Sequence, residues 1–277
     1  MEIISQARSF NGTQRVYRHD SKTLNCSMNF GIYLPDNLKT RIPALFWLSG
    51  LTCTEDNFIT KGTAQRVASE LGMIIVAPDT SPRGDGVPDD AEGSYDFGLG
   101  ASFYLNATES PWKQHYQMES YIEEELYNLI IESFPVDQNK IGIFGHSMGG
   151  HGALTIALRS PSKFKSVSAF SPICSPIQSP WGEKAFASYL GEDRSTWRKY
   201  DTCALIEDGA KFSSILIDQG SDDQFIKEQL KPTLLQSICS KADIDLKFRM
   251  QPGFDHSYFF ISTFIDDHLK WHLDHLS

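Results

Sequence analysis

The stretch that decides the fold is Lys140–Leu154, which reads KIGIFGHSMGGHGAL. Its first part, Ile141–Phe144, is a short apolar run typical of a buried strand, and a helix-forming segment, Gly150–Arg159, follows it. The turn between them, Gly145–Gly149, has the pattern GxSxG, which in a strand–turn–helix context is typical of a serine nucleophile. Glycines are needed there because larger side chains would collide with the neighbouring strand and helix. We therefore predict Ser147 as a nucleophile on a tight turn.

Six further apolar runs along the chain predict other strands of the same sheet. They are near-continuous rather than alternating, as strands covered by helices on both faces must be. Helix-like segments separate them, so we predict the α/β class, as a three-layer sandwich with a mostly parallel central sheet flanked by helices. The other strands are expected at Phe30–Leu34, Ala44–Leu48, Met73–Ala77, Ser166–Phe170, Ser214–Ile217 and Asp245–Met250. The other helices are expected at Thr63–Leu71, Met118–Glu132, Phe225–Ala242 and Tyr258–His272.

The chain carries no sign of a division into parts. It has no repeat with a period of about 20–50 residues and no low-complexity or Pro/Gly/Ser-rich linker, so residues 1–277 are expected to form one domain. Two long segments, Asp79–Trp112 and Ser171–Leu190, carry no strand or helix pattern. Loops of that length in a compact domain are typical of functional surfaces.

Composition excludes several classes of partner. The 277 residues include 25 Lys and Arg against 35 Asp and Glu, a net charge of −10. An acidic chain lacks the basic surface that nucleic acids and anionic membranes attract, so neither is expected as a partner. The apolar runs are also far shorter than the about 20 residues that span a membrane. Five scattered cysteines without a CxxC pair, and no apparent secretory signal, predict no metal site and a cytoplasmic protein.

A serine hydroxyl becomes a good nucleophile only when a base takes its proton. In folds with a nucleophile on such a turn, the acid and then the histidine follow the serine along the chain. His256 lies in a turn between the last predicted strand and the last helix, from which it can lean over Ser147, and we predict it as the base. His268, His272 and His275 lie on or beyond the final helix at near-helical spacing and are expected at the surface.

Several aspartates are candidates for the acid that orients the histidine. Asp222 and Asp223 are neighbours in the loop after a predicted strand, and adjacent loop residues point in different directions, so only one can face His256. Asp218, at the end of that strand, is a third candidate. Asp255 adjoins the histidine and would have difficulty reaching its far nitrogen. Spacing alone does not choose between Asp222 and Asp223.

At this point the chain resembles the S-formylglutathione hydrolases, the esterase D family of α/β-hydrolases. The resemblance extends from about residue 17 to the C-terminal helix, with one departure at Phe254, where the family often has Tyr. It implies hydrolysis of S-formylglutathione to glutathione and formate, the last step of glutathione-dependent formaldehyde detoxification, with no cofactor. The motifs that carry it are Trp47–Cys53, Ala77–Gly84, Phe103–Thr108, Gly145–Gly152, Ser179–Gly182 and Pro252–Tyr258.

The resemblance also implies roles for site residues. It assigns the acid to Asp223, beside Ser147 and His256. The N–H of Met148, at the start of the helix after the nucleophile, is expected to face the developing oxyanion, and the loop after an early strand supplies a second donor, for which we predict Leu51. The resemblance further implies a glutathione thioester as the small-molecule substrate and a homodimer.

Four residues are expected to bind or surround the substrate. Cys53 ends the loop Ser49–Cys53 that carries Leu51 (the oxyanion loop), and it is either a thiol switch or a small buried residue. Because glutathione is anionic and the chain is acidic, cations are expected near the pocket mouth, and Lys61 and Arg83 are the candidates. Trp181 is expected to line a small acyl pocket.

Phe103 and Tyr104 are expected to help wall off that acyl pocket. A broad short-acyl carboxylesterase would need the same catalytic residues and differ only in the pocket, so it remains the main alternative. An acyltransferase and a non-catalytic hydrolase-like binding protein are further alternatives, and an intact serine, acid and histidine in order argues against the last.

Overall fold

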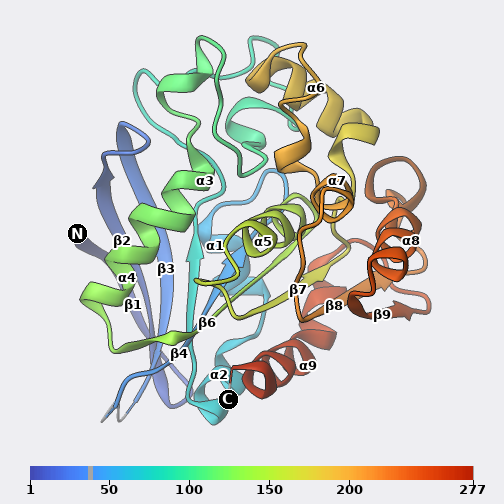
Figure 1. The fold of residues 1–277 in the computed structure, drawn as a ribbon. Coiled ribbons are helices and arrows are strands. Elements are labelled where there is room, and N and C mark those ends of the chain that lie inside the picture. The colour runs from blue at the N-terminus through green and yellow to red at the C-terminus, as the bar shows by residue number, and fades with distance from the viewer. Residues whose placement is uncertain (37–39, 277) are drawn as a thin grey trace.

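The protein is described by a computed structural model that covers residues 1–36 and 40–276. Within these residues the strands form a nine-stranded sheet in the order β1-β2-β3-β5-β4-β6-β7-β8-β9. Helices cover both faces of the sheet (Figure 1), which confirms the predicted α/β class. The strands are β1 (Glu2–Ser9), β2 (Gly12–Ser21), β3 (Cys26–Pro35), β4 (Ile42–Leu48), β5 (Ile74–Pro78), β6 (Val136–His146), β7 (Ser166–Phe170), β8 (Ser214–Gly220) and β9 (Asp245–Gln251).

The sheet has a parallel part and an antiparallel part. The six strands from β5 through β4, β6, β7 and β8 to β9 pair in parallel, whereas β1, β2 and β3 pair with one another, and β3 with β5, antiparallel. All seven predicted strands are present. The sequence missed β1 and β2, because β1 is exposed along nearly its whole length and has no apolar run.

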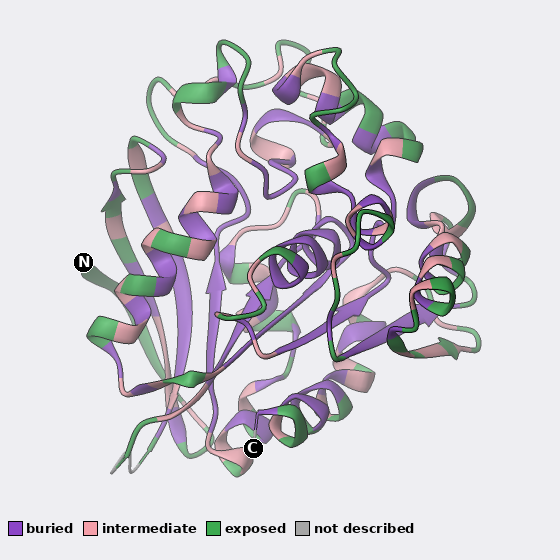
Figure 2. Cartoon of the chain, viewed as in Figure 1, coloured by how far each residue is buried: buried purple, intermediate pink, exposed green. Residues whose placement is uncertain are grey.

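Both faces of the central strands are buried. Along β4, Phe46 and Leu48 point into one apolar core, while Leu45 and Trp47 point into the other. This alternation explains why the run is apolar throughout, since neither face meets water. Figure 2 shows the same burial across the middle of the sheet and along α5.

The helices divide between the two faces. α5 packs on β6, β7 and β4, and α7 and α8 lie on the same face, while α1, α2 and α9 cover the other (Figure 1). The α-helices are α1 (Glu55–Lys61), α2 (Gln65–Leu71), α3 (Met118–Ser120), α4 (Tyr127–Ser133), α5 (Met148–Arg159), α6 (Pro180–Leu190), α7 (Thr202–Glu207), α8 (Pro232–Ala242) and α9 (Tyr258–His275). Short 3₁₀ turns lie at Gly98–Gly100, Trp112–Gln114, Pro176–Gln178 and Arg198–Tyr200, and π-helical turns at Tyr121–Leu126 and Ile226–Leu230.

Two helix predictions and one loop prediction need correction. The helix expected over Met118–Glu132 changes to a π-helical turn at Tyr121–Leu126, and the one over Phe225–Ala242 begins with a π-helical turn before α8. Ser171–Leu190, expected as a loop, contains α6, which begins with Ser179 accepting a hydrogen bond from the N–H of Gly182. The sequence missed α6 because its glycine, proline and serine residues obscure the helical pattern.

The prediction that His268 and His272 lie at the surface is wrong. Both are fully buried where α9 packs on β7. His272 lies between the hydroxyls of Ser166 and Ser168, at 2.6 and 2.8 Å, and His268 contacts Ser168 at 2.8 Å. The small serines of β7 leave room for two imidazoles and bond their nitrogens, so burial is tolerated. His275 is exposed, as expected.

Candidate active site

The Gly145–Gly149 turn is as tight as its sequence predicts. β6 ends at His146 and α5 begins at Met148, with Ser147 between them at φ 57° and ψ −119°. A Cβ on Gly145 would lie 2.4 Å from the carbonyl oxygen of Gly149, and one on Gly149 would lie 2.0 Å from that of Leu48. The two glycines therefore let the turn close against its neighbours, and Ser147 is held at the amino end of α5.

An acid and a histidine from two other loops meet beside this turn. Nδ1 of His256 lies 2.6 Å from Oδ2 of Asp223, and because a carboxylate only accepts, the ring nitrogen donates. Asp222 is exposed and accepts from the hydroxyl of Ser221, so of the two neighbouring aspartates only Asp223 faces the ring. Asp255 bonds instead to Ser257, two residues along the chain.

The carboxylate of Asp223 is held in its charged form. Burial acts most strongly and raises its pKa, but the hydrogen bond and the charge of His256, the N–H of Phe225 and the hydroxyl of Ser171 together outweigh burial and lower it. The N–H of Phe225 donates to Oδ1 at 2.9 Å, and Nε2 of Gln219 donates to Oδ2 at 3.2 Å. The acid is thus ionised and fixed in orientation.

Asp218, the remaining candidate acid, is occupied elsewhere. It is fully buried within β8, where the guanidinium of Arg249 donates to both of its oxygens and Nε2 of His268 lies 3.3 Å away. It also accepts from Gln251 at 3.3 Å, in the segment that leads to His256. Asp218 therefore joins β8 to β9 and α9 and does not face His256.

The loop after β4 approaches Ser147 closely. A Cβ on Gly50 would lie 3.1 Å from the Cβ of Ser147 and 3.3 Å from Nδ1 of His146. The loop is tied down on its far side, where Tyr104 donates to the carbonyl of Ser49 at 2.9 Å and Arg83 donates to that of Cys53 at 3.3 Å. Glycine at position 50 therefore allows the backbone of the loop to lie against Ser147.

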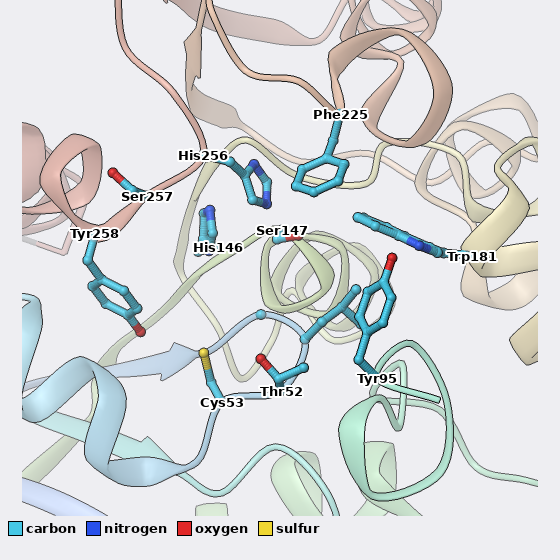
Figure 3. A pocket seen from close by; sticks show the side chains of 12 residues that line it. Thr52, Cys53, Tyr95, His146, Ser147, Trp181, Phe225, His256, Ser257 and Tyr258 are labelled. Carbon is cyan, nitrogen blue, oxygen red and sulfur yellow. The ribbon is translucent and has the colours of Figure 1, made fainter. Parts of the chain in front are cut away.

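A cavity of about 260 Å³ opens over the serine. Figure 3 shows Ser147 at its floor, His256 and His146 at one side and an aromatic wall on the other. The wall is continuous, because the ring of Trp181 lies 4.8 Å from that of Phe225 and 6.3 Å from that of Tyr95. The cavity is lined by Gly50, Leu51, Thr52, Cys53, Tyr95, His146, Ser147, Trp181, Phe225, His256, Ser257 and Tyr258.

The residues expected to bind substrate fall into two groups. Cys53 and Trp181 line the cavity, as does Leu51, the predicted oxyanion donor. Lys61 and Arg83 are not among its lining residues in the part of the chain that the structure describes. Arg83 pairs with Asp79 at 2.9 Å, and Nζ of Lys61 lies 6.0 Å from the ring of Tyr258.

Phe103 and Tyr104, expected as walls of the acyl pocket, pack elsewhere. Both are fully buried, and within the described residues neither lines the cavity. The N–H of Phe103 donates to the sulfur of Met148 at 3.3 Å, and a Cβ on Gly152 would lie 2.7 Å from the ring of Tyr104. They support α5 from behind rather than shape the pocket.

Sequence reasoning missed several residues of the cavity, including four with ring side chains. Tyr95 belongs to Asp79–Trp112, the long segment after β5 that the sequence predicts as a functional surface. Phe225 and Tyr258 lie two residues after Asp223 and His256, and that spacing was the available signal. His146 stands directly before the nucleophile inside GxSxG, at a position that the pattern leaves open.

The part of the chain that the structure describes contains neither a candidate spanning helix nor a candidate metal centre. Within residues 1–36 and 40–276, no helix has both the length and the apolar character to cross a bilayer. The same residues contain no group of three or more His, Cys, Asp and Glu side chains placed to hold a metal ion.

The fold and the serine, histidine and aspartate beside the cavity define the α/β-hydrolase class of serine esterases. The chain belongs to the Esterase family, whose model, described as "Putative esterase", matches residues 21–271. It is 52% identical over 280 residues to the S-formylglutathione hydrolase of Rattus norvegicus, covering 100% of this chain and 99% of the rat protein. The Mus musculus S-formylglutathione hydrolase is 52% identical over 281 residues, with the same coverage. A solved S-formylglutathione hydrolase from Agrobacterium tumefaciens superposes with a TM-score of 0.98 at 52% identity, covering 100% of both chains.

Proposed function

We propose that this protein hydrolyses S-formylglutathione to glutathione and formate, as a step of formaldehyde detoxification. The observation that carries the proposal is full-length identity of 52% to proteins named S-formylglutathione hydrolase, in a chain whose serine, histidine and aspartate meet at one cavity. The roles below are assigned on that basis.

Ser147 is the nucleophile, His256 the base and Asp223 the orienting acid. His256 takes the proton of the Ser147 hydroxyl as its oxygen attacks the thioester carbonyl, and the resulting imidazolium is stabilised by the Asp223 carboxylate at 2.6 Å. When the tetrahedral intermediate collapses, the carbon–sulfur bond breaks and the glutathione thiolate leaves, taking the proton from His256. A formyl ester of Ser147 remains.

The oxyanion is held by two backbone N–H groups, those of Met148 and Leu51. Met148 is the first residue of α5, where the helix dipole and unpaired N–H groups favour negative charge. Leu51 lines the cavity in the loop that Gly50 brings against Ser147. Such donors act on charge that develops only in the transition state, and removing one typically costs about 10²–10³-fold in rate.

Water then completes the reaction. His256, neutral again, takes a proton from a water molecule that attacks the formyl ester, and it returns that proton to Ser147 as formate leaves. The cavity of about 260 Å³ with its aromatic wall suits a small acyl group. The glutathionyl group extends toward Tyr95, a cavity residue that is 57% exposed.

The two predicted cations, Lys61 and Arg83, differ in how they could act on the substrate. Lys61 is exposed behind Tyr258 and is free to approach an anionic glutathionyl group. Arg83 already pairs with Asp79 and bonds the oxyanion loop, so its first effect is on that loop. We also infer that residues 1–277 form one domain, that the protein acts as a homodimer and that it resides in the cytoplasm.

One comparison tests the function. The wild-type protein is expected to release glutathione and formate from S-formylglutathione with a much higher kcat/KM than it shows for an aryl acetate. Ser147→Ala is expected to abolish both activities, because the nucleophile is lost. A higher kcat/KM for the aryl ester would favour the broad carboxylesterase, and full turnover by Ser147→Ala would contradict every version of the mechanism.

A further inference from the structure

The imidazole of His146 lies against that of His256 inside the cavity. The two ring centroids are 4.3 Å apart with an angle of 45° between the planes, and His146 is only 7% exposed. Its Nε2 is buried and has no hydrogen-bond partner among the described residues. Contact between the two histidines is therefore made by the rings rather than by a hydrogen bond.

The hydrogen bond from His256 to Asp223 leaves one motion of the ring free. It fixes the position of Nδ1, but the ring can still rotate about that point, which would carry Nε2 away from Ser147. Figure 3 shows His256 between His146 and Phe225, and the Phe225 ring meets it edge-on at 5.0 Å. These two neighbouring rings restrict the plane of the His256 ring.

His146 is neutral, which suits its position against the His256 ring. Burial first, and then the charge of His256, lower the pKa of His146 well below its ordinary value, so its ring is neutral when His256 becomes an imidazolium. The titratable side chains that line the cavity with it are Cys53 from the loop after β4, Tyr95 from the segment after β5, His256 from the loop after β9, and Tyr258 from α9. All are thiol, phenol or imidazole groups, so within the described residues no carboxylate lining the cavity stabilises a charged His146.

We propose that His146 is a positioning residue that holds the plane of the His256 ring by ring-to-ring contact, so that Nε2 stays directed at Ser147. The inference rests on the proposed function, in which His256 is the base. A neutral aromatic face also tolerates the positive charge that His256 acquires during turnover. The role is specific to the base and requires a ring, not a hydrogen-bonding nitrogen, at position 146.

The test compares His146→Ala, which removes the ring, with His146→Phe, which keeps a ring and removes both nitrogens. His146→Ala is expected to lower kcat for S-formylglutathione by about 10–100-fold, because small misplacements of reacting groups have effects of that size. KM is expected to change by less than about twofold, since the defect lies in the transition state. His146→Phe is expected to recover most of the lost kcat.

Two further measurements separate positioning from a merely structural effect. The downfield proton resonance of Nδ1–H of His256 is expected to exchange faster with water in His146→Ala than in the wild type, and His146→Phe is expected to restore slow exchange. His146→Gln has a similar reach without a ring and serves if phenylalanine overfills the space near Gly50. It is expected to behave as His146→Ala does.

Wild-type kcat and slow exchange in His146→Ala would overturn the proposal. It would also fail if His146→Phe folded, as judged by thermal unfolding, yet stayed as slow as His146→Ala, or if His146→Gln turned over like the wild type. The resonance and an aryl acetate assay do not depend on the natural substrate. If the wild-type protein does not hydrolyse S-formylglutathione, the proposed function is contradicted. The positioning role of His146 is then still decided by the resonance and by the aryl acetate assay.

Discussion

Asp223 and His256 meet at 2.6 Å although they belong to different loops, which follow the neighbouring strands β8 and β9. The two loops are also joined through their backbones. The N–H of Ser221 donates to the carbonyl of Gln251 at 3.0 Å, and the N–H of Asp222 donates to the carbonyl of Phe254 at 2.9 Å. The backbone thus sets the distance between acid and base.

Replacing Asp223 by Asn is expected to lower kcat by about 10⁴-fold, because the amide no longer holds His256 in the tautomer that accepts a proton from serine. KM is expected to change little. Asp222→Asn is the matched control, since Asp222 is the exposed neighbour in the same loop and faces away from the ring. Steady-state kinetics on S-formylglutathione decide the point, and an equal loss in both variants would contradict the assignment of the acid.

Replacing Gly50 by Ala is expected to lower kcat about 100-fold, because its new methyl group would lie 3.1 Å from the Cβ of Ser147 and push the Leu51 N–H away from the oxyanion. Leu51→Ala keeps that N–H and is expected to retain most of the turnover. If Leu51→Ala lowers kcat as much as Gly50→Ala does, then turnover depends on the side chain of Leu51 rather than on its backbone N–H.

Much of the site could be predicted because chain order and local geometry constrain it. The GxSxG turn predicts Ser147 as the nucleophile from a few neighbouring residues, and the order along the chain then favours His256 as the histidine placed in a suitable loop. The choice between Asp222 and Asp223 depends on where two loops meet in space, which no local pattern records. Only the resemblance to a family selected Asp223.

The errors in the fold prediction also arise from contacts between segments that are separate in the sequence. β1 is exposed on both faces, so it carries no apolar run, and it forms because β2 offers it a hydrogen-bonding edge. His268 and His272 are predicted at the surface because they lie on the final helix at near-helical spacing. Their burial depends on Ser166 and Ser168 of β7, about 100 residues away in the chain, which bond their nitrogens.

Cys53 is expected to behave as a protonated thiol that lines the cavity. Burial raises its pKa above the ordinary value, against the smaller opposing effect of a hydrogen bond with Tyr258. Since only the thiolate reacts, inactivation by N-ethylmaleimide is expected to be slow at pH 7 and to accelerate as the pH rises. Cys53→Ala is expected to retain turnover and to lose this inactivation. Equal sensitivity of the variant would show that another cysteine reacts.

Trp181 is expected to limit the size of the acyl group, because it lines the cavity and packs on Phe225. Trp181→Ala is expected to raise kcat/KM for a butyryl ester relative to an acetyl ester by about 10-fold or more, as one methylene in a closed pocket is worth about 10–200-fold. Trp181→Phe keeps a ring there and is expected to shift the ratio less. An unchanged ratio in Trp181→Ala would place the limit on acyl size elsewhere.

Buried histidines are expected to make the fold sensitive to mild acid. His151 is buried in α5, and burial lowers its pKa from 6.5 to about 4, against the smaller effect of its bond to the carbonyl of Phe103 at 3.1 Å. The unfolded chain therefore takes up a proton below about pH 6.5 that the folded protein refuses until about pH 4. Stability is full above that window and falls through it, by about 1.4 kcal/mol per pH unit for one histidine. His146, His268 and His272, whose pKa values burial also lowers, act in the same direction.

His151→Gln isolates this contribution, because an amide can still donate to Phe103 but does not titrate. The free energy of unfolding, measured in urea at several pH values between 7 and 4.5, is expected to fall less steeply in the variant, by about 1.4 kcal/mol per pH unit. His275→Gln is the matched control, since this exposed histidine of α9 is expected to leave the slope unchanged. If His151→Gln follows the wild-type slope, His151 does not resist protonation in the folded protein.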